Sequence, residues 1–188
     1  MRAFVSRTLA TALIGAPIAA QNQAEAEQQS IESSFARATL VVRDADVSLS
    51  LYRDALGLGV VGDRPVSTEA ISAPSTGEPG AKARLIMLRG AEPTVGWIGL
   101  IQWTEPAMPE PGSYPARLQP GSTVLVFRVP DAEAACARAA EVPGVTVTAP
   151  MNERTFMGSS PDNPVRVRTC TFFDPDGHLL EVSQRIAD

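Results

Sequence analysis

Histidine is nearly absent from this chain of 188 residues, in which His178 is the only one. One chain therefore cannot supply the two histidines of an iron site with one carboxylate, or the three of a zinc site. A serine–histidine–aspartate triad would have to use His178 itself. Aromatic residues make up only 5% of the chain, so aliphatic residues and alanine must form most of the core.

Positive charge is also scarce. The formal net charge is −5, and the sequence contains no run of lysines or arginines. Binding to nucleic-acid phosphates needs a basic face. We therefore expect no nucleic-acid partner.

The chain has two cysteines, Cys136 and Cys170, without a C-x-x-C motif or zinc-ligand spacing. An exported chain could join them in one disulfide. Two small buried thiols would serve a core equally well, and Cys136 lies among alanines where a helix is expected. Both interpretations stay open at this point.

The first 26 residues have the layout of a secretory signal peptide. Two early arginines precede a mostly small and apolar stretch at 9–20, and Ala24–Ala26 forms an A-x-A cleavage pattern. The apolar stretch is too short to span a bilayer. We expect residues 1–26 to be a signal peptide and 27–34 a polar linker, giving a periplasmic or secreted protein with no membrane span after cleavage. The alternatives are a frayed N-terminal helix on a cytoplasmic protein and, for an exported protein, an uncleaved membrane anchor.

Residues 35–185 are interpreted as a single domain. Short β-branched or apolar runs predict strands, and helical spacing after an aspartate predicts helices. The expected strands lie at 38–42, 58–61, 83–88, 97–103, 123–129, 145–148, 165–173 and 178–183, and the expected helices at 44–56 and 131–141. Stretches rich in proline, glycine and polar residues predict loops at 65–80, 105–121 and 151–164.

The order of these elements repeats at a fixed offset of 87 residues. The offset separates the expected helix caps, Asp44 and Asp131, and also the glycines expected to end the helices, Gly57 and Gly144. Each unit therefore has the order strand, helix and three strands. The two units span about 36–104 and 122–185. Because one helix covers only one face of a four-stranded sheet, we expect an α+β fold in which two tandem βαβββ units form a barrel-like cleft.

Two stretches resemble the vicinal oxygen chelate superfamily, which includes glyoxalase I, extradiol dioxygenases and bleomycin-resistance proteins. Leu40–Leu58, LVVRDADVSLSLYRDALGL, matches the family pattern of a strand, an aspartate, a serine four residues later, and Tyr-Arg-Asp-x-Leu-Gly. Phe172–Val182, FFDPDGHLLEV, matches its closing hairpin. With the repeat, the resemblance covers about residues 36–185. Both motifs specify helix packing and turn geometry, so neither identifies an activity.

The resemblance implies a divalent metal bound by the first and fourth strands of each unit. The matching first-strand positions are Arg37 and Val124, and neither residue can bind a metal. The fourth-strand position of the first unit falls near Gly99 to Gln102, where only Gln102 has a suitable oxygen, and that of the second is Glu181. We therefore expect neither the usual metal nor another cofactor. A hard cation bound weakly by Glu181 and Gln102 with waters stays the alternative.

The other cleft positions suit a small organic molecule. Strand alternation groups Arg37 with Val41 and Val124 with Arg128, and turns either the two tryptophans or Gln102 inward. Such a cavity fits a ligand with an aromatic or anionic part. The expected ligand-binding residues are Arg37, Val41, Trp97, Gln102, Trp103, Val124, Arg128 and Arg168. An Arg37–Glu181 ion pair in place of the lost metal is the alternative.

Three kinds of function follow. The first is a metal-free protein that binds a small molecule in the cleft between its units, as the resemblance to bleomycin-resistance proteins implies. The second is a metal-dependent lyase like glyoxalase I, or a dioxygenase, with a non-standard site in which Glu181 is a ligand or catalytic base. The third is an interaction module whose cleft is filled by its own side chains. The resemblance is compatible with a homodimer, which the sequence does not decide.

The export interpretation predicts a processed N-terminus. N-terminal sequencing of protein from the periplasm should start near Gln21 or Glu27. An intact Met1 on protein recovered from the cytosol would contradict it.

Overall fold

The computed structural model describes residues 35–67, 80–92, 96–108, 113, 117–158 and 164–186. The expected signal peptide and linker lie outside these residues. The chain divides after Phe35, and Ala36–Asp188 forms one compact unit, which is described by itself below. In the part of the chain that the structure describes, no helix is long and apolar enough to cross a membrane.

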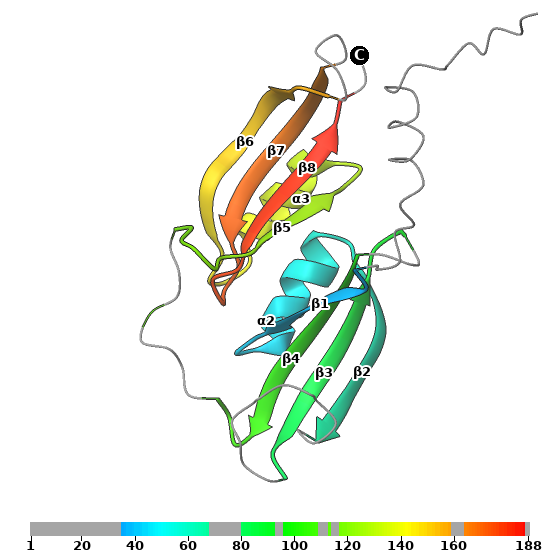
Figure 1. Cartoon of the computed structure of the whole chain (residues 1–188), viewed down its shortest axis with the longest axis vertical. Helices are drawn as coiled ribbons and strands as arrows, with labels where there is room; N and C mark the ends of the chain where they lie inside the picture. Colours follow the sequence, from blue (N-terminus) through cyan, green and yellow to red (C-terminus); the bar gives the residue numbers. More distant parts are fainter. Residues whose placement is uncertain are drawn as a thin grey trace, which may run out of the picture. The chain divides into compact units, whose positions relative to one another are not determined.

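The first half of this unit is a four-stranded sheet with one helical segment (Figure 1). Its elements are β1 (Arg37–Val41), α2 (Ala45–Leu49), the π-helix η1 (Ser50–Ala55), β2 (Gly59–Ser67), β3 (Lys82–Arg89) and β4 (Trp97–Glu105). The strands lie in the order β1-β4-β3-β2, with β1 parallel to β4 and the other pairs antiparallel.

The second half repeats this topology. Its elements are β5 (Val124–Arg128), α3 (Ala132–Ala140), β6 (Thr146–Phe156), β7 (Val165–Phe173) and β8 (Leu179–Arg185). The order is β5-β8-β7-β6, again with the first strand parallel to the last. The predicted α+β fold of two βαβββ units is therefore confirmed.

Two predicted loops begin later than expected, because the strands before them are longer. β2 continues through Pro65 to Ser67, and β6 continues to Phe156, paired with Val165. Both are edge strands with mostly exposed side chains, so they lack the apolar pattern on which the prediction relied. An edge strand also accepts proline, because one side of its backbone makes no ladder hydrogen bonds.

The predicted helix signals act as expected. The Asp44 carboxylate accepts two backbone N–H groups of the first turn of α2, at 2.9 and 3.2 Å, and the Asp131 carboxylate accepts one in α3, at 3.0 Å. Gly57 and Gly144 have φ angles of 81° and 85°, in the left-handed region that favours glycine.

A second repeated contact fixes the start of each helix. The Ala45 N–H donates to Gln102 Oε1 at 3.1 Å, and the Ala132 N–H donates to Gln184 Oε1 at 3.2 Å. The two glutamines are one residue beyond Ile101 and Ser183, which pair with the last residues of β1 and β5. They therefore occupy equivalent places, and each satisfies an otherwise unpaired N–H at a helix start.

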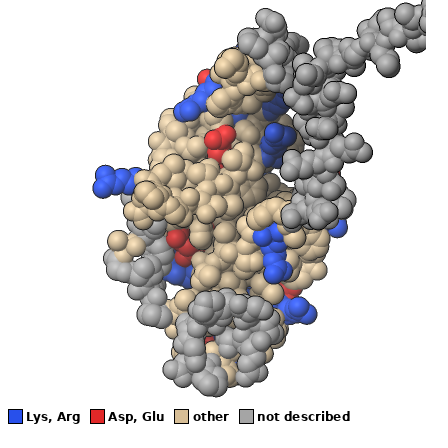
Figure 2. All heavy atoms as spheres, in the orientation of Figure 1, with Lys and Arg blue, Asp and Glu red and all other residues tan. Residues whose placement is uncertain are grey.

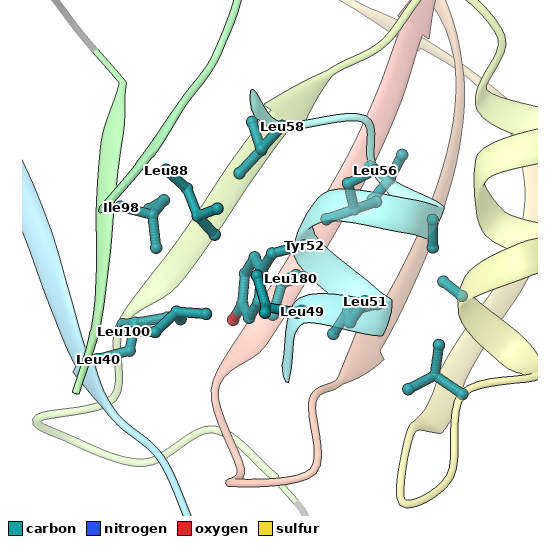
Figure 3. Close-up of a cluster of buried hydrophobic side chains, with 14 of the residues drawn as sticks. Leu40, Leu49, Leu51, Tyr52, Leu56, Leu58, Leu88, Ile98, Leu100 and Leu180 are labelled. Atoms are coloured by element: carbon teal, nitrogen blue, oxygen red, sulfur yellow. The ribbon is translucent and has the colours of Figure 1, made fainter. Parts of the chain in front are cut away.

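One hydrophobic core lies between the two sheets. It contains the helix-facing side chains of both sheets together with the buried faces of α2, η1 and α3. Figure 3 shows Tyr52 of η1 among aliphatic side chains that include Leu100 from β4 and Leu180 from β8. The Tyr52 ring also lies 6.1 Å from that of Phe127 in β5, measured between centroids. The two halves are therefore joined on their helix sides.

A buried hydrogen bond adds a polar connection between the halves. The Tyr52 hydroxyl donates to Asp174 Oδ2 at 2.8 Å, and both residues are almost fully buried. Asp174 Oδ1 accepts the backbone N–H groups of Asp176 at 3.0 Å and His178 at 2.7 Å, which shapes the β7–β8 turn. Burial raises the pKa of the Asp174 carboxyl and, together with the nearby carboxylate, that of the Tyr52 hydroxyl. An ion pair between Arg43 and Asp176, 3.0 Å long, lies beside it.

The two cysteines form a disulfide between Cys136 in α3 and Cys170 in β7. The bond closes a loop with a sequence separation of 34 residues. It joins the helix to a strand inside the core. The sequence left open a disulfide or two free thiols, and the structure shows the disulfide.

Removing the Tyr52 hydroxyl should destabilise the fold without changing its shape. Tyr52→Phe keeps the ring but leaves Oδ2 of the buried Asp174 without its donor, so the free energy of unfolding should fall by about 1–3 kcal/mol. Urea denaturation measures this change. Thr148→Val, which removes a hydroxyl from an exposed Thr–Thr contact, is the control and should change it by less than about 0.5 kcal/mol. Equal effects of the two substitutions would contradict the role given to Tyr52.

Candidate functional site

Each sheet has an outer face on the far side from the shared core. In the first sheet, Arg37 and Val41 of β1 pair with Trp97 and Ile101 of β4, and directly paired residues share a face. Trp103 follows by alternation. The outer face of the first sheet therefore contains Arg37, Thr39, Val41, Leu85, Trp97, Ile101 and Trp103.

The outer face of the second sheet is built in the same way from β5 and its partners. Val126 pairs with Glu181, and Glu181 pairs with Thr171. The face contains Val124, Val126, Arg128, Asn152, Arg154, Thr169, Thr171 and Glu181. Val41, Val124 and Val126 are 46%, 42% and 61% exposed, so both outer faces present apolar side chains to solvent near their first strands.

Most of the predicted ligand-binding residues lie on these two faces, but two do not. Gln102 lies on the helix-facing side of β4, where its side-chain oxygen caps α2, so it is not beside Arg37. Arg168 also lies on the opposite side from Thr169, and its Nε donates to Glu153 at 3.1 Å. The structure thus selects Trp97 with Trp103 rather than Gln102 for the outer face.

The register of the strands identifies the missing fourth-strand position. Thr39 pairs with Gly99 in the first sheet. Val126, which is the equivalent of Thr39 in the second half, pairs with Glu181. Gly99 therefore corresponds to Glu181, and it has no side chain. A Cβ at Gly99 would lie 2.9 Å from Thr39 Oγ1, so a ligating side chain would need Thr39 to move.

The four equivalent positions do not fit the metal that the fold family implies. They hold Arg37, Gly99, Val124 and Glu181, of which only the last has a donor atom for a metal. Across the described residues, no group of three or more His, Cys, Asp or Glu side chains is placed to bind an ion.

Arg37 and Glu181 lie on the outer faces of different sheets. Nη1 of Arg37 contacts Sδ of Met87 at 3.6 Å, and no ion pair in the described part of the chain joins Arg37 to Glu181. The alternative of an Arg37–Glu181 ion pair is therefore not found within one chain, among the residues that the structure describes.

A small polar pocket lies on the outer face of the second sheet, and we call it the β6–β8 pocket. It has a volume of about 20 Å³. Its lining residues are Ala149, Asn152, Arg154, Phe156, Thr169, Cys170, Thr171 and Glu181. Thr169 is only 4% exposed, and its hydroxyl has no hydrogen-bond partner among the described residues.

The sequence pattern does not predict most of this pocket. Asn152, Arg154 and Phe156 fall in a stretch predicted as a loop, and Thr169 falls in a predicted strand without being a candidate site residue. A sequence signal for Thr169 and Thr171 does exist. Along β7 they alternate with two arginines, so the threonine hydroxyls and the guanidinium groups lie on opposite faces of the sheet.

Two further polar atoms are buried without a partner. Trp103 is 5% exposed and packs with Ala83 and Ile101, and its Nε1 has no acceptor. His178 Nε2 is likewise unpaired, but His178 belongs to the β7–β8 turn and does not line the β6–β8 pocket. The single histidine therefore shapes a turn in this structure.

Charged side chains are spread over the surface. On the face shown in Figure 2, lysine and arginine side chains lie apart from one another and do not gather into one basic area. Several are ion-paired: Arg168 and Arg166 lower the pKa of the Glu153 carboxyl, and Arg84 lowers that of Asp63. These groups stabilise edges of the sheets rather than the pocket.

Comparison with known proteins identifies the family. The model of the Glyoxalase/Bleomycin resistance protein/Dioxygenase superfamily matches residues 34–182. No match to a curated protein is found.

One solved structure shows the same fold, and two further ones are similar to the chain at lower scores. A glyoxalase family protein from Bacillus cereus is 18% identical, with a TM-score of 0.59 over 84% of this chain and 99% of its own. The antibiotic-binding protein TnmS3 from Streptomyces sp. CB03234 is 22% identical, with a TM-score of 0.48 over 84% of this chain and 100% of its own. A glyoxalase I mutant from Zea mays is 14% identical, with a TM-score of 0.47 over 79% of this chain and 45% of its own.

Proposed function

Because the chain belongs to the Glyoxalase/Bleomycin resistance protein/Dioxygenase superfamily, we propose that it binds a small organic molecule on its outer sheet faces without the metal usual in that family. The observation that supports this most directly is the residue set at the four equivalent positions. An arginine, a glycine and a valine stand with Glu181 where ligands would be needed. One carboxylate is too few donors for a tightly bound divalent ion.

The two outer faces suit different parts of an organic molecule. The first presents the partly exposed Trp97 with Arg37 at its edge. Ile101 and Trp103 lie on the same face but are buried in a small cluster. The second has the β6–β8 pocket, lined in part by Glu181, which pairs with the exposed Val126 of β5. Apolar walls with a few convergent polar groups are the usual composition of a small-molecule site.

A second copy of the chain would complete such a site. Within one chain the shared core separates the two outer faces, so they do not enclose a ligand together. Two copies related by a two-fold axis would place the first outer face of each opposite the second outer face of the other. The exposed Val41, Val124 and Val126 support this proposal, because burying them would remove apolar surface from water.

Metal-free binding predicts a protein that needs no ion for its stability. After purification without chelator, elemental analysis should find Ni, Zn, Fe and Mn far below one per chain, and added metal or EDTA should not change the melting temperature. In two-dimensional NMR, indole and 2-naphthol should shift amide signals of both outer faces. A stoichiometric metal would contradict the metal-free site, and unshifted outer-face signals with every aromatic probe would contradict the binding function.

The two-copy site predicts a dimer that depends on the outer faces. Val126→Glu should weaken self-association at least about tenfold, which corresponds to about 1.4 kcal/mol, because a charge would enter an apolar contact. Sedimentation velocity over a concentration series measures it. Val60→Glu, at a valine of β2 that is 42% exposed, is the control and should leave association unchanged. A wild-type protein that stays monomeric at the highest concentration would contradict the second copy.

A further inference from the structure

The β6–β8 pocket contains one charge of each sign without a counter-ion. Glu181 is half-buried, and in the described part of the chain its carboxylate has no ion pair or hydrogen bond. Arg154 uses Nε to donate to Asn152 Oδ1 at 3.0 Å, and no described carboxylate pairs with its guanidinium group. Both residues line the same small space.

The hydroxyl of Thr169 is the third unused group. It is buried to more than nine-tenths and faces the same pocket, where leaving it unpaired costs free energy. Its neighbours are satisfied: Thr171 Oγ1 lies 3.0 Å from Thr148 Oγ1, and Asn152 Nδ2 donates to Pro150 O at 2.9 Å. Thr169 therefore differs from the polar groups around it.

The other carboxylate on the strands of this sheet, in the part of the chain that the structure describes, has partners. Glu153, on the other side of β6, accepts from Arg166 at 3.2 Å and from Arg168 at 3.1 Å. The sheet thus supplies two cations to an exposed carboxylate and none to the half-buried Glu181. A carboxylate that has left bulk water normally has a partner.

We propose that the β6–β8 pocket binds the ammonium and carboxylate groups of an aromatic zwitterion, such as a free aromatic amino acid. The ammonium group donates to Glu181 and Thr169, and the carboxylate pairs with Arg154. This inference rests on the proposed function, since it specifies the ligand of the same surface. A free amino acid has an ammonium group to pair with Glu181 and an adjacent carboxylate to pair with Arg154. A peptide N-terminus has the ammonium group but lacks the adjacent carboxylate.

The size and surroundings of the pocket support this class. A volume of about 20 Å³ holds one water-sized group, which is the size of an ammonium group. Phe156, 46% exposed, lies at the pocket and offers a ring surface for the aromatic part. The guanidinium group of Arg154 is exposed, which leaves room for a carboxylate at the entrance.

Two other partners of the Glu181 carboxylate would give different results in the binding experiment. A divalent cation would need further ligands beyond this carboxylate, and no cluster of ligating side chains surrounds it among the described residues. Arg37 of a second copy would pair with Glu181 only in the dimer proposed above. Both enter the test as outcomes that contradict the zwitterion.

The experiment compares three probes that differ in charge: L-phenylalanine, phenethylamine and 3-phenylpropanoate. Calorimetric titration of the full chain measures Kd for each. L-Phenylalanine should bind at least about tenfold more tightly than either single-charge probe. Its addition should shift the NMR signals of Thr169, Thr171 and Glu181 more than those of β2.

Variants identify which side chain binds the ammonium group and which binds the carboxylate. Glu181→Gln should remove the difference in Kd between L-phenylalanine and 3-phenylpropanoate, because the ammonium group loses its carboxylate. Arg154→Gln should remove the difference in Kd between L-phenylalanine and phenethylamine, because the carboxylate loses its guanidinium group. Thr169→Val, which keeps the side-chain shape, should weaken L-phenylalanine binding by about three- to tenfold. Glu153→Gln and Arg166→Gln are the matched controls on the same sheet, and they should leave all three Kd values unchanged.

The contradicting outcomes are distinct from a failure of the proposed function. If indole and 2-naphthol bind but L-phenylalanine has no advantage, the zwitterion is wrong and small-molecule binding stands. If no aromatic probe binds, both are wrong. If MnCl2 alone shifts the Glu181 signals and Glu181→Gln abolishes that shift, the pocket is a cation site. If Arg37→Ala and Glu181→Gln weaken self-association equally and L-phenylalanine does not bind, a second copy fills the pocket.

Discussion

Both sheets bury their helix-facing side against one shared core, and the rest of the structure depends on this constraint. Tyr52 lies at the centre of that core, contacts Phe127 of the other half and donates to the buried Asp174. Once the helix-facing sides are used in this way, the opposite side of each sheet is left outward (Figure 1). The proposed binding surface is therefore the part of each sheet that the core does not use. Its side chains along β1 and β5 are not needed for packing in the core.

The two halves are similar in the contacts that build the fold and different on their outer faces. The aspartate caps, the left-handed glycines and the glutamines that bind the first helical N–H all recur. Outside the core, Gly99 corresponds to Glu181, and Val41 corresponds to Arg128. A repeated scaffold can keep its backbone geometry while its solvent-facing side chains diverge, because those side chains contribute little to folding. The difference between an aromatic face and a polar face is thus compatible with a common fold.

Several features were predictable from the sequence because they depend on local signals. The caps at Asp44 and Asp131, the helix ends at Gly57 and Gly144 and the central strands follow from residue type and spacing. The edge strands β2 and β6 were predicted too short, since their exposed side chains carry no apolar periodicity. Gln102 was misplaced because the face of a strand residue depends on register, and a change of one position moves a side chain to the other side of the sheet.

The two-unit fold and the absence of the histidine ligands can be predicted from the chain alone, because both can be counted along it. The same counting leaves Glu181 and the amide of Gln102 as the possible donors. The three-dimensional arrangement is needed to show that this amide caps a helix, that Gly99 is the counterpart of Glu181, and that Arg37 and Glu181 lie on different outer faces. It alone brought Thr169, Arg154 and Glu181 into one pocket. The physical reason is that pairing register and burial join residues far apart in sequence, and no local pattern records which of them meet.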